Sequence, residues 1–412
     1  MQILKMTGLV ALVSGALPAE AETLTLEAAV ARARQQSPDV QLASRLVEEA
    51  EASRVGVGVP LTNPRLFADY RPMLIELPGQ PTDPRNGYNI GVDGQFEVSG
   101  AGFSRQAEVT KRIEVARAEL DWERDRAAAR AWVAYVDALL ATQRVRRVQE
   151  SLELQKRVAE AAQKRVTEGV AGEPELTTVL VEVASVERDL SEAQRRFQAA
   201  RLELATVLDT EPGMEWELSD TGLTPPEAPS EAELVSRALE HRPELRLVKA
   251  RLALLEATDE RLGREAFPKL GYNLGIDAAP ASPAFGYAGL SVEIPVANRN
   301  QGQRAVARAQ RETEKARLKS QLRRVAREVA LSRHSYEARR QQVMLLTEHA
   351  LPQARRTQSL IEEGWRAGRF DIFRLTGAAR DTLRLEREHL ETLSAAWADW
   401  VELQRTSGGL NP

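Results

Sequence analysis

The sequence contains no cysteine among its 412 residues, and aromatic side chains account for only 5% of it. The lack of cysteine excludes disulfide bonds, thiolate metal sites and a cysteine nucleophile. Histidine is also scarce, and the four present lie far apart, with no pair at the spacing of zinc ligands: His241, His334, His349 and His389. We therefore expect neither a resident metal nor a cofactor.

Motifs that signal catalysis are missing as well. The chain has no P-loop, no glycine-rich dinucleotide turn after a strand, no Gly-x-Ser-x-Gly and no His-Glu-x-x-His, so we predict that it is not an enzyme. Its net charge of −4 gives no reason to expect a nucleic-acid partner. No later apolar run approaches the roughly 18 residues that a membrane-spanning helix needs.

The N-terminal segment, residues 1–21, has the composition of a secretory signal peptide. Lys5 precedes an apolar stretch, and Ala19-Glu20-Ala21 has the small-x-small pattern of a cleavage site. An ordinary N-terminal helix is the alternative. An exported chain without a membrane helix is periplasmic, secreted or an outer-membrane β-barrel.

Alternation of apolar and polar residues predicts four short strands, at about residues 65–73, 88–98, 269–278 and 287–295. A tilted strand of this length can span a bilayer, with apolar side chains outward and polar ones inward. Four strands do not close a barrel, so membrane strands would need several copies of the chain; soluble hairpins packed on helices are the alternative. Four acidic residues occupy inward positions: Asp93, Glu97, Asp277 and Glu293. They would give a lumen a negative field that favours cations, or would merely be solvated.

The remaining sequence has the periodicity of very long helices, at about residues 104–167, 174–208, 303–363 and 370–404. Apolar residues recur at alternating steps of four and three, which is typical of coiled coils. Pro352 lies inside the third of these patterns and should kink or interrupt it.

The chain is an internal duplication with a period near 200 residues. Pro38-Asp39-Val40 matches Pro243-Glu244-Leu245, and Gly169 matches Gly368, each in the same order along its half. We assign a first repeat to residues 22–215, a linker to 216–230 and a second repeat to 231–412.

Taken together, these features resemble the TolC family of outer-membrane efflux channels over residues 22–412. The resemblance rests on the following segments: the openings Ser37-Pro38 and Arg242-Pro243, the strand-to-helix passage from Val292 to Ala305, and the segment with Leu351-Pro352, Gly364, Gly368 and Ala378. The turn Asn298-Arg299-Asn300-Gln301-Gly302 is most similar to the cation-efflux (CzcC-like) branch of the family.

The resemblance implies a mainly α protein with a membrane β-barrel portion. Three identical chains would each contribute four strands to a twelve-stranded barrel in outer-membrane lipid, and their helices would form a hollow α-barrel in the periplasm. A periplasmic adaptor (a membrane fusion protein) and an inner-membrane pump of the resistance-nodulation-division type would complete the efflux path. The cargo expected is heavy-metal cations. A duct for drugs or for type I protein secretion, and a non-conducting periplasmic coiled-coil scaffold, are the alternatives.

The resemblance also singles out residues at the periplasmic aperture: Glu173, Glu175, Asp371 and Arg374. Glu175 stands at an acidic aperture position of the family, whereas Arg374 stands where some members carry an acid. This departure permits an ion pair between Glu175 and Arg374 that latches the closed state. Alternatively, Glu173 and Glu175 only complement the N-terminus of a helix that begins near Pro174.

Overall fold

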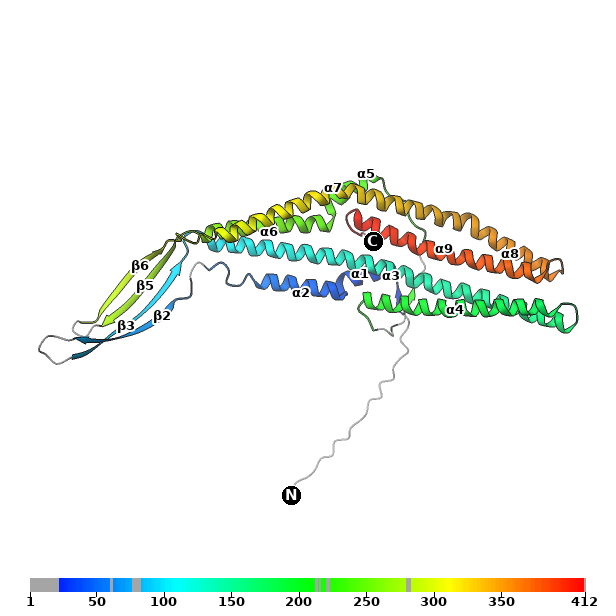
Figure 1. Cartoon of the computed structure of the whole chain (residues 1–412), viewed down its shortest axis with the longest axis horizontal. Helices are drawn as coiled ribbons and strands as arrows, with labels where there is room; N and C mark the ends of the chain where they lie inside the picture. The colour runs from blue at the N-terminus through cyan, green and yellow to red at the C-terminus, as the bar shows by residue number, and fades with distance from the viewer. Residues whose placement is uncertain are drawn as a thin grey trace, which may run out of the picture.

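The computed structural model describes residues 22–59, 62–75, 83–211, 214, 216–219, 223–278 and 283–410. The predicted signal peptide, residues 1–21, lies outside this part of the chain. The molecule is a long rod, with a β-sheet at one end and helices along the rest (Figure 1). Two helical hairpins form the opposite end, which we call the tip.

The sheet has four antiparallel strands in the order β2-β3-β5-β6. Their bounds are Arg65–Ile75 (β2), Asp83–Phe96 (β3), Lys269–Ala278 (β5) and Phe285–Glu293 (β6). β3 begins earlier than the sequence pattern indicates, because its ladder with β2 continues past Pro84 and Pro72 as far as the pair Asp83 and Ile75. β3 and β5 pair along their length, so one sheet joins the two repeats.

The helices are as follows: α1 (Leu26–Gln36), α2 (Pro38–Ala52), α3 (Ala101–Thr167), α4 (Glu173–Val207), α5 (Glu231–His241), α6 (Pro243–Glu265), α7 (Gln301–Leu345), α8 (Leu351–Arg366) and α9 (Ile372–Thr406). The 67 residues of α3 correspond to about 100 Å at 1.5 Å per residue. No described helix combines the length and the apolar character needed to cross a membrane.

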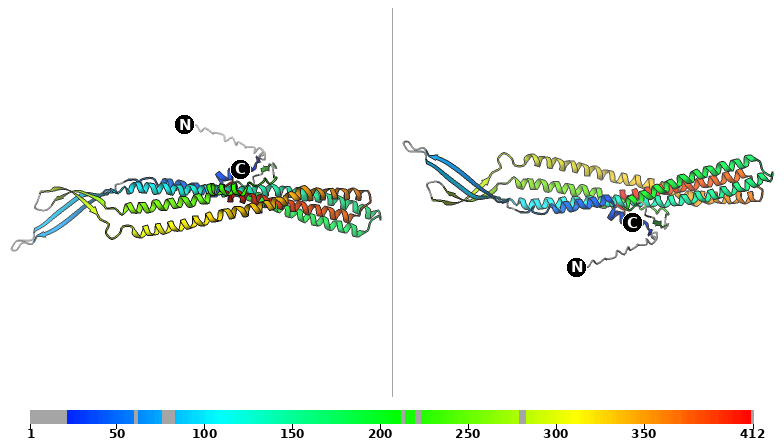
Figure 2. Two further views of the ribbon diagram at one scale, coloured as in Figure 1. Left: turned by 90° about the horizontal axis from the view of Figure 1, so that it is seen from above. Right: turned by 90° about the horizontal axis from the view of Figure 1, so that it is seen from below.

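The helices lie side by side along the rod (Figure 2), and Figure 1 shows α3 between α6 on one side and α2 and α4 on the other. Near the sheet, α2 contacts α3, α3 contacts α6, and α6 contacts α7; toward the tip, α3 contacts α4 and α9, and α9 contacts α8. Within the described part of the chain, the buried side chains form several separate clusters along the rod instead of one core. Small residues at the predicted coiled-coil seam, including Ala127, Ala131 and Ala138, are fully buried and let the helices approach closely.

Segment 216–230, predicted as a linker, contributes a short strand. Strand β4 (Trp216–Leu218) pairs in parallel with β1 (Glu22–Leu24) at the start of the first repeat. The buried Tyr135 hydroxyl of α3 donates to the carbonyls of Leu24 and Ser219, each at 2.9 Å, and so fastens both strands to the central helix. Three-residue strands carry no periodicity that a sequence pattern could detect.

The helix predicted for residues 303–363 is interrupted where Pro352 indicated. A π-helical turn, η1 (Leu346–Ala350), separates α7 from α8, and Pro352 is the second residue of α8. Proline has no N–H to donate to the carbonyl four residues earlier, that of Glu348, so the regular ladder cannot pass through this point. The counterpart helix α3 has no proline and no interruption.

Candidate functional site: the sheet faces and the helical tip

The strand register gives the sheet two unlike faces. Asn89, Asp93 and Asn273 share one face with Asp277, whereas residues one position along every strand share the other. That second face is apolar and exposed: it carries Leu66, Ile90, Leu274, Ile276 and Leu290. Leu290 is 77% exposed. A continuous apolar surface of this kind needs lipid or protein to cover it.

Each acidic residue predicted to face a lumen has a partner within the chain. Asp93 pairs with Arg65 of the neighbouring strand at 2.9 Å, and Asp277 pairs with Arg71. These two cations lie on the same polar face as the carboxylates. They neutralise the charge that the sequence alone assigned to that face.

The remaining two acids lie where the sheet meets the helices. Glu97 accepts hydrogen bonds from both terminal nitrogens of Arg105 on α3, at 2.8 and 2.6 Å. Glu293 accepts one from the Gln95 amide at 3.2 Å and stands opposite Lys269 in the register. The hydrogen bonds that Arg105 donates to Glu97 raise the pKa of Arg105 above its usual value. Each of the four carboxylates therefore has a cationic or amide partner on or beside the polar face. The negative field predicted for a lumen stays a prediction.

At the tip, each of the two hairpins turns at a glycine with positive φ. Gly169 follows α3 with φ of 74°, and Gly368 follows α8 with φ of 72°. Side chains with a β-carbon are strained in this left-handed conformation, so these glycines end the helices. The two matching glycines of the duplicated sequence thus mark matching turns.

The four predicted aperture residues lie at the starts of α4 and α9. Glu173 and Glu175 occupy the first turn of α4, where carboxylates complement the helix N-terminus. Asp371 caps α9, and its side chain accepts a hydrogen bond from the Arg374 backbone N–H at 2.8 Å. The Arg374 guanidinium lies over the Phe370 ring, 5.6 Å from its centroid. Within the described chain, no ion pair joins Glu175 to Arg374.

Two other ion pairs join the hairpins slightly above the tip. The Arg380 Nε of α9 donates to both carboxylate oxygens of Glu182 on α4, at 3.2 and 3.1 Å, and the pKa of Arg380 is raised by these hydrogen bonds. Arg387 donates to Asp189 at 2.9 Å. Glu182 is only 6% exposed. We call these two contacts the α4–α9 clasp.

Sequence reasoning missed the clasp. Glu182 and Arg380 are 198 residues apart, and so are Asp189 and Arg387. This spacing is one residue shorter than the 199 residues that separate the matching glycines Gly169 and Gly368, so the repeat period does not pair these residues. The contacts depend on how α4 and α9 lie against each other, which the sequence pattern does not contain.

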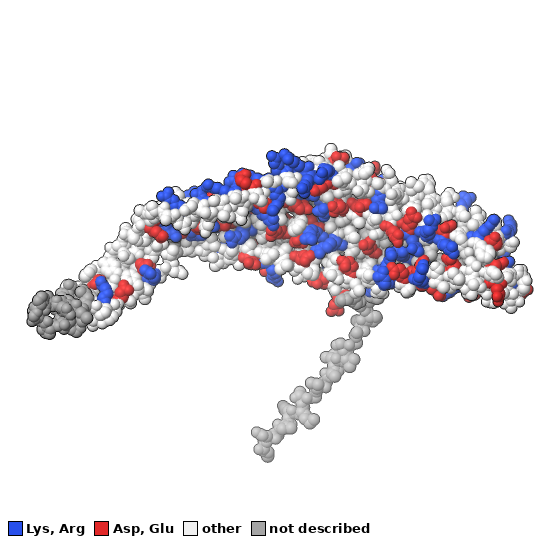
Figure 3. Space-filling view, viewed as in Figure 1, with Lys and Arg blue, Asp and Glu red and all other residues white. Residues whose placement is uncertain are grey.

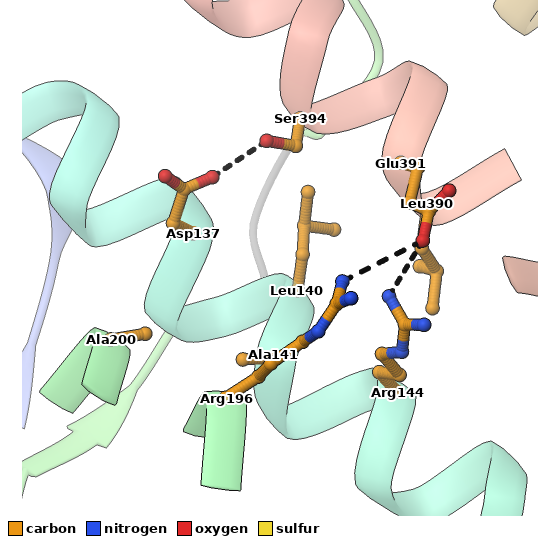
Figure 4. Close-up of a pocket in the computed structure, with 9 residues that line it drawn as sticks. All are labelled: Asp137, Leu140, Ala141, Arg144, Arg196, Ala200, Leu390, Glu391 and Ser394. Atoms are coloured by element: carbon orange, nitrogen blue, oxygen red, sulfur yellow. Dashed lines mark hydrogen bonds and ion pairs between the residues drawn. The ribbon is translucent and has the colours of Figure 1, made fainter. Parts of the chain in front are cut away.

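A cleft of about 340 Å³ lies above the clasp, between α3, α4 and α9 (Figure 4). Arg144 and Arg196 both point at Glu391, at 2.9 and 3.7 Å. The Ser394 hydroxyl of the same cleft donates to Asp137 at 2.6 Å. These polar groups pair with one another. The cleft is therefore a place where polar contacts join the helices. Among described residues, no group of three or more His, Asp or Glu side chains is arranged to hold a metal ion.

A comparison with protein-family models found no match to the chain. The cobalt-zinc-cadmium resistance protein CzcC of Cupriavidus metallidurans is 25% identical over 392 residues, which cover 93% of this chain and 90% of that protein. Among solved structures, the outer-membrane channel OprN superimposes with a TM-score of 0.74 at 19% identity, covering 93% of this chain and 90% of that one. The CmeC outer membrane channel of Campylobacter jejuni gives 0.75 at 14% identity, covering 98% and 94%.

These similarities extend over nearly the whole chain, including both the sheet and the long helices. They confirm the predicted fold class and the resemblance to the TolC family of outer-membrane channels. The chain therefore has the architecture of a TolC-type outer-membrane efflux channel. The relatives named above are two outer-membrane channels and one resistance protein.

Proposed function

We propose that this chain is the outer-membrane exit duct of a tripartite efflux pump. One observation carries the proposal: a four-stranded sheet with one polar and one exposed apolar face stands at the end of a helical rod about 100 Å long. The apolar face suits lipid and the polar face suits a water-filled passage. The rod is long enough to reach deep into the periplasm.

The duct forms when three copies assemble. β2 and β6 are the outer strands of the sheet, and each pairs with a neighbour on one side only. Lipid does not tolerate an unpaired strand edge, so the β6 edge of one copy must pair with the β2 edge of another. Three copies give twelve strands. A periplasmic adaptor and an inner-membrane pump of the resistance-nodulation-division type would supply the energy.

The cargo we propose is divalent heavy-metal cations, as the name of the similar protein CzcC suggests. A passive duct need not bind what it carries, so the missing metal cluster among described residues does not conflict with this cargo. Growth of a strain that lacks this protein, measured in the presence of metals or of drugs, distinguishes metal efflux from drug efflux. Sensitivity to cobalt, zinc and cadmium, reversed by the intact gene, supports metal efflux; sensitivity confined to drugs supports a drug duct.

The tip residues are proposed to set the resting aperture. Glu173 and Arg374 are exposed, so they are accessible to a neighbouring copy. If Arg374 and Glu175 latch adjacent copies, Arg374→Ala should raise the open probability in a planar bilayer. Arg369→Ala, an exposed arginine in the same turn, is the matched control. Unchanged opening in Arg374→Ala would remove the latch and leave the two glutamates as helix-terminal residues only.

Membrane fractionation distinguishes the duct from a non-conducting periplasmic scaffold. We expect the mature chain in the outer-membrane fraction, extracted only by detergent, because its apolar sheet face requires lipid. Recovery as a soluble periplasmic protein would contradict the proposed function.

A further inference from the structure

The junction between the sheet and the rod carries an exposed apolar surface that lies outside the paired strands. Phe103, at the start of α3, is 80% exposed. On the side of the molecule drawn in Figure 3, uncharged residues cover most of this junction. We call the exposed apolar residues just beyond the strands the collar; its members are Val98, Phe103, Phe267, Ile294 and Val296.

The collar continues the apolar face of the sheet toward the helices. In β3 and β6 the even-numbered residues belong to that face, and Val98 and Ile294 are the next even positions after each strand ends. The helical part of such a channel is periplasmic, so the collar stands at the periplasmic end of the sheet. At this height acyl chains give way to lipid headgroups, and an apolar surface there meets the boundary of the leaflet.

One arginine stands beside the collar in each half of the chain, and both are held in the same way. Arg264 Nη1 donates to the Ser99 carbonyl at 3.2 Å, and Arg299 Nε donates to the Pro295 carbonyl at 3.0 Å. Each carbonyl follows a glutamate and a β-branched residue at the place where a strand ends. The two arginines therefore hold corresponding turns from strand to helix.

Neither guanidinium group is neutralised by a close carboxylate. Arg264 lies 3.6 Å from the exposed Glu260, and no carboxylate of a described residue pairs with Arg299. Arg264 also belongs to the collar region, because its Nη1 and the Phe103 ring lie 3.8 and 3.9 Å from the place that a β-carbon of Gly100 would occupy. Apolar contact and positive charge thus lie next to each other.

This combination fits a phospholipid. The planar guanidinium group of arginine binds phosphate oxygens through two N–H groups at once. The first turns of α3 and α7 contain no acidic residue, so the positive end of each helix dipole adds to the charge of the arginines.

We propose that the collar and its two arginines bind glycerophospholipid at the periplasmic face of the outer membrane. Acyl chains lie against the collar, and phosphodiester groups lie against Arg264 and Arg299. Because both arginines also hold a carbonyl at a strand end, the bound phosphate steadies the turn that joins sheet to rod. This inference rests on the proposed function.

Lipid retention tests the phosphate contact. The assembled mature protein is incubated in detergent with phosphatidylglycerol, and bound lipid is counted by native mass spectrometry. Arg264→Gln with Arg299→Gln should lower the bound phosphatidylglycerol at least fivefold, because glutamine keeps a donor for the carbonyl but has no charge.

A matched control changes two exposed arginines near the tip, Arg384→Gln with Arg356→Gln. Arg384 has a similar weak partner, Asp381 at 3.7 Å, and Arg356 has no ion-pair partner among the described residues. This variant should retain as much lipid as the wild type. Equal retention by all three proteins would overturn the phosphate contact, and so would equal binding of an uncharged diacylglycerol with the same acyl chains by the wild type.

Spin labels locate the collar, because the natural chain has no cysteine. In phospholipid vesicles, a nitroxide at Phe103→Cys should be reached by oxygen, which dissolves in lipid, and shielded from a water-soluble nickel chelate. Val170→Cys, in the exposed tip turn, is the control and should show the reverse. A label at position 103 that the chelate reaches freely would place the collar in water, and one shielded from both reagents would place it under a neighbouring copy. Either result overturns the lipid contact.

The two proposals fail separately. A protein that conducts in a planar bilayer, but retains the same lipid after both arginine changes, would overturn the collar site and leave the proposed function standing. A mature chain recovered as a soluble periplasmic protein would overturn both.

Discussion

The two repeats build the same kind of long helix in unlike surroundings. In α3, 23 of 67 residues are buried, whereas in its counterpart α7 only 5 of 45 are buried. α3 is continuous, and the counterpart is divided by the π-turn before Pro352. Two long helices thus have unlike surroundings: α3 contacts other helices over much of its length, whereas α7 lies at the edge of the chain. In the proposed assembly, a neighbouring copy covers this edge helix.

The largest expected effect tests this contrast by removing side chains of similar size from each helix. Ile113 of α3 is 1% exposed, so Ile113→Ala should lower the free energy of unfolding by about 2–5 kcal/mol. Leu331 of α7 is 62% exposed, and Leu331→Ala should change that free energy by less than about 0.5 kcal/mol. Urea unfolding of dilute, separated chains gives both values. Equal losses of unfolding free energy would contradict the contrast and show that the two helices contribute equally to the stability of one chain.

A second test uses one buried tyrosine from each repeat. Tyr135 of α3 donates to two carbonyls that belong to the β1 and β4 segments, while Tyr336 of α7 donates to the Pro226 carbonyl. Tyr135→Phe removes the hydroxyl that links both segments to α3, although the Leu24 carbonyl still accepts a hydrogen bond from the Ser219 N–H at 3.2 Å. The change should cost about 1 kcal/mol, more than Tyr336→Phe, because it loosens two segments instead of one. Thermal unfolding of the two variants measures the difference. A larger loss for Tyr336→Phe would reverse the assigned importance of the two repeats.

A third, smaller effect concerns the clasp, where the repeats contribute opposite charges. Glu182→Ala should destabilise the α4–α9 contact by about 1 kcal/mol, because Arg380 remains largely hydrated after losing its partner. Hydrogen exchange of the α4 and α9 amides measures this loss. Exchanging the two residues, Glu182→Arg with Arg380→Glu, should restore part of it. Arg384→Ala, an exposed residue of α9, is the control; an equal effect there would mean that the clasp contributes nothing.

The smallest effect is a pH dependence at the π-turn, which among the described residues is found in the second half of the chain. The His389 ring lies 3.0 Å from the Thr347 hydroxyl, and burial, aided by the positive charge of Arg355, lowers the pKa of His389 despite the opposing effect of Glu386. The unfolded chain then binds the proton more readily, so stability falls as the pH drops below about 6.5. His389→Gln should flatten this dependence. An unchanged slope would exclude His389 as its source.

Periodic signals were enough to predict most of the fold. Alternation located the four strands, the long apolar repeats located the helices, and Pro352 located the interruption of α7. Matching glycines located the tip turns, because a left-handed turn demands glycine at Gly169 and Gly368. Each of these signals lies within a short stretch of sequence. It could therefore be interpreted without knowing which distant elements are in contact.

Contacts between distant elements escaped prediction. The β1–β4 pair is too short to have a pattern, and the partners of Asp93 and Asp277 depend on strand register. The pair that the sequence permitted between Glu175 and Arg374 does not form among the described residues of one chain, where the Arg374 side chain lies over Phe370. Both residues lie in the first turn of their helices, α4 and α9, but sequence spacing contained no information about side-chain direction.

The central claim is that assembled copies form a passive channel. Single-channel recording of the purified mature protein in a planar bilayer tests it most directly, with the wild type beside a variant that lacks the clasp, Glu182→Ala with Asp189→Ala. We predict discrete current steps that are more frequent in the variant, because its hairpins separate more easily. Silence from both proteins, with each shown to be inserted in the bilayer, would contradict the account.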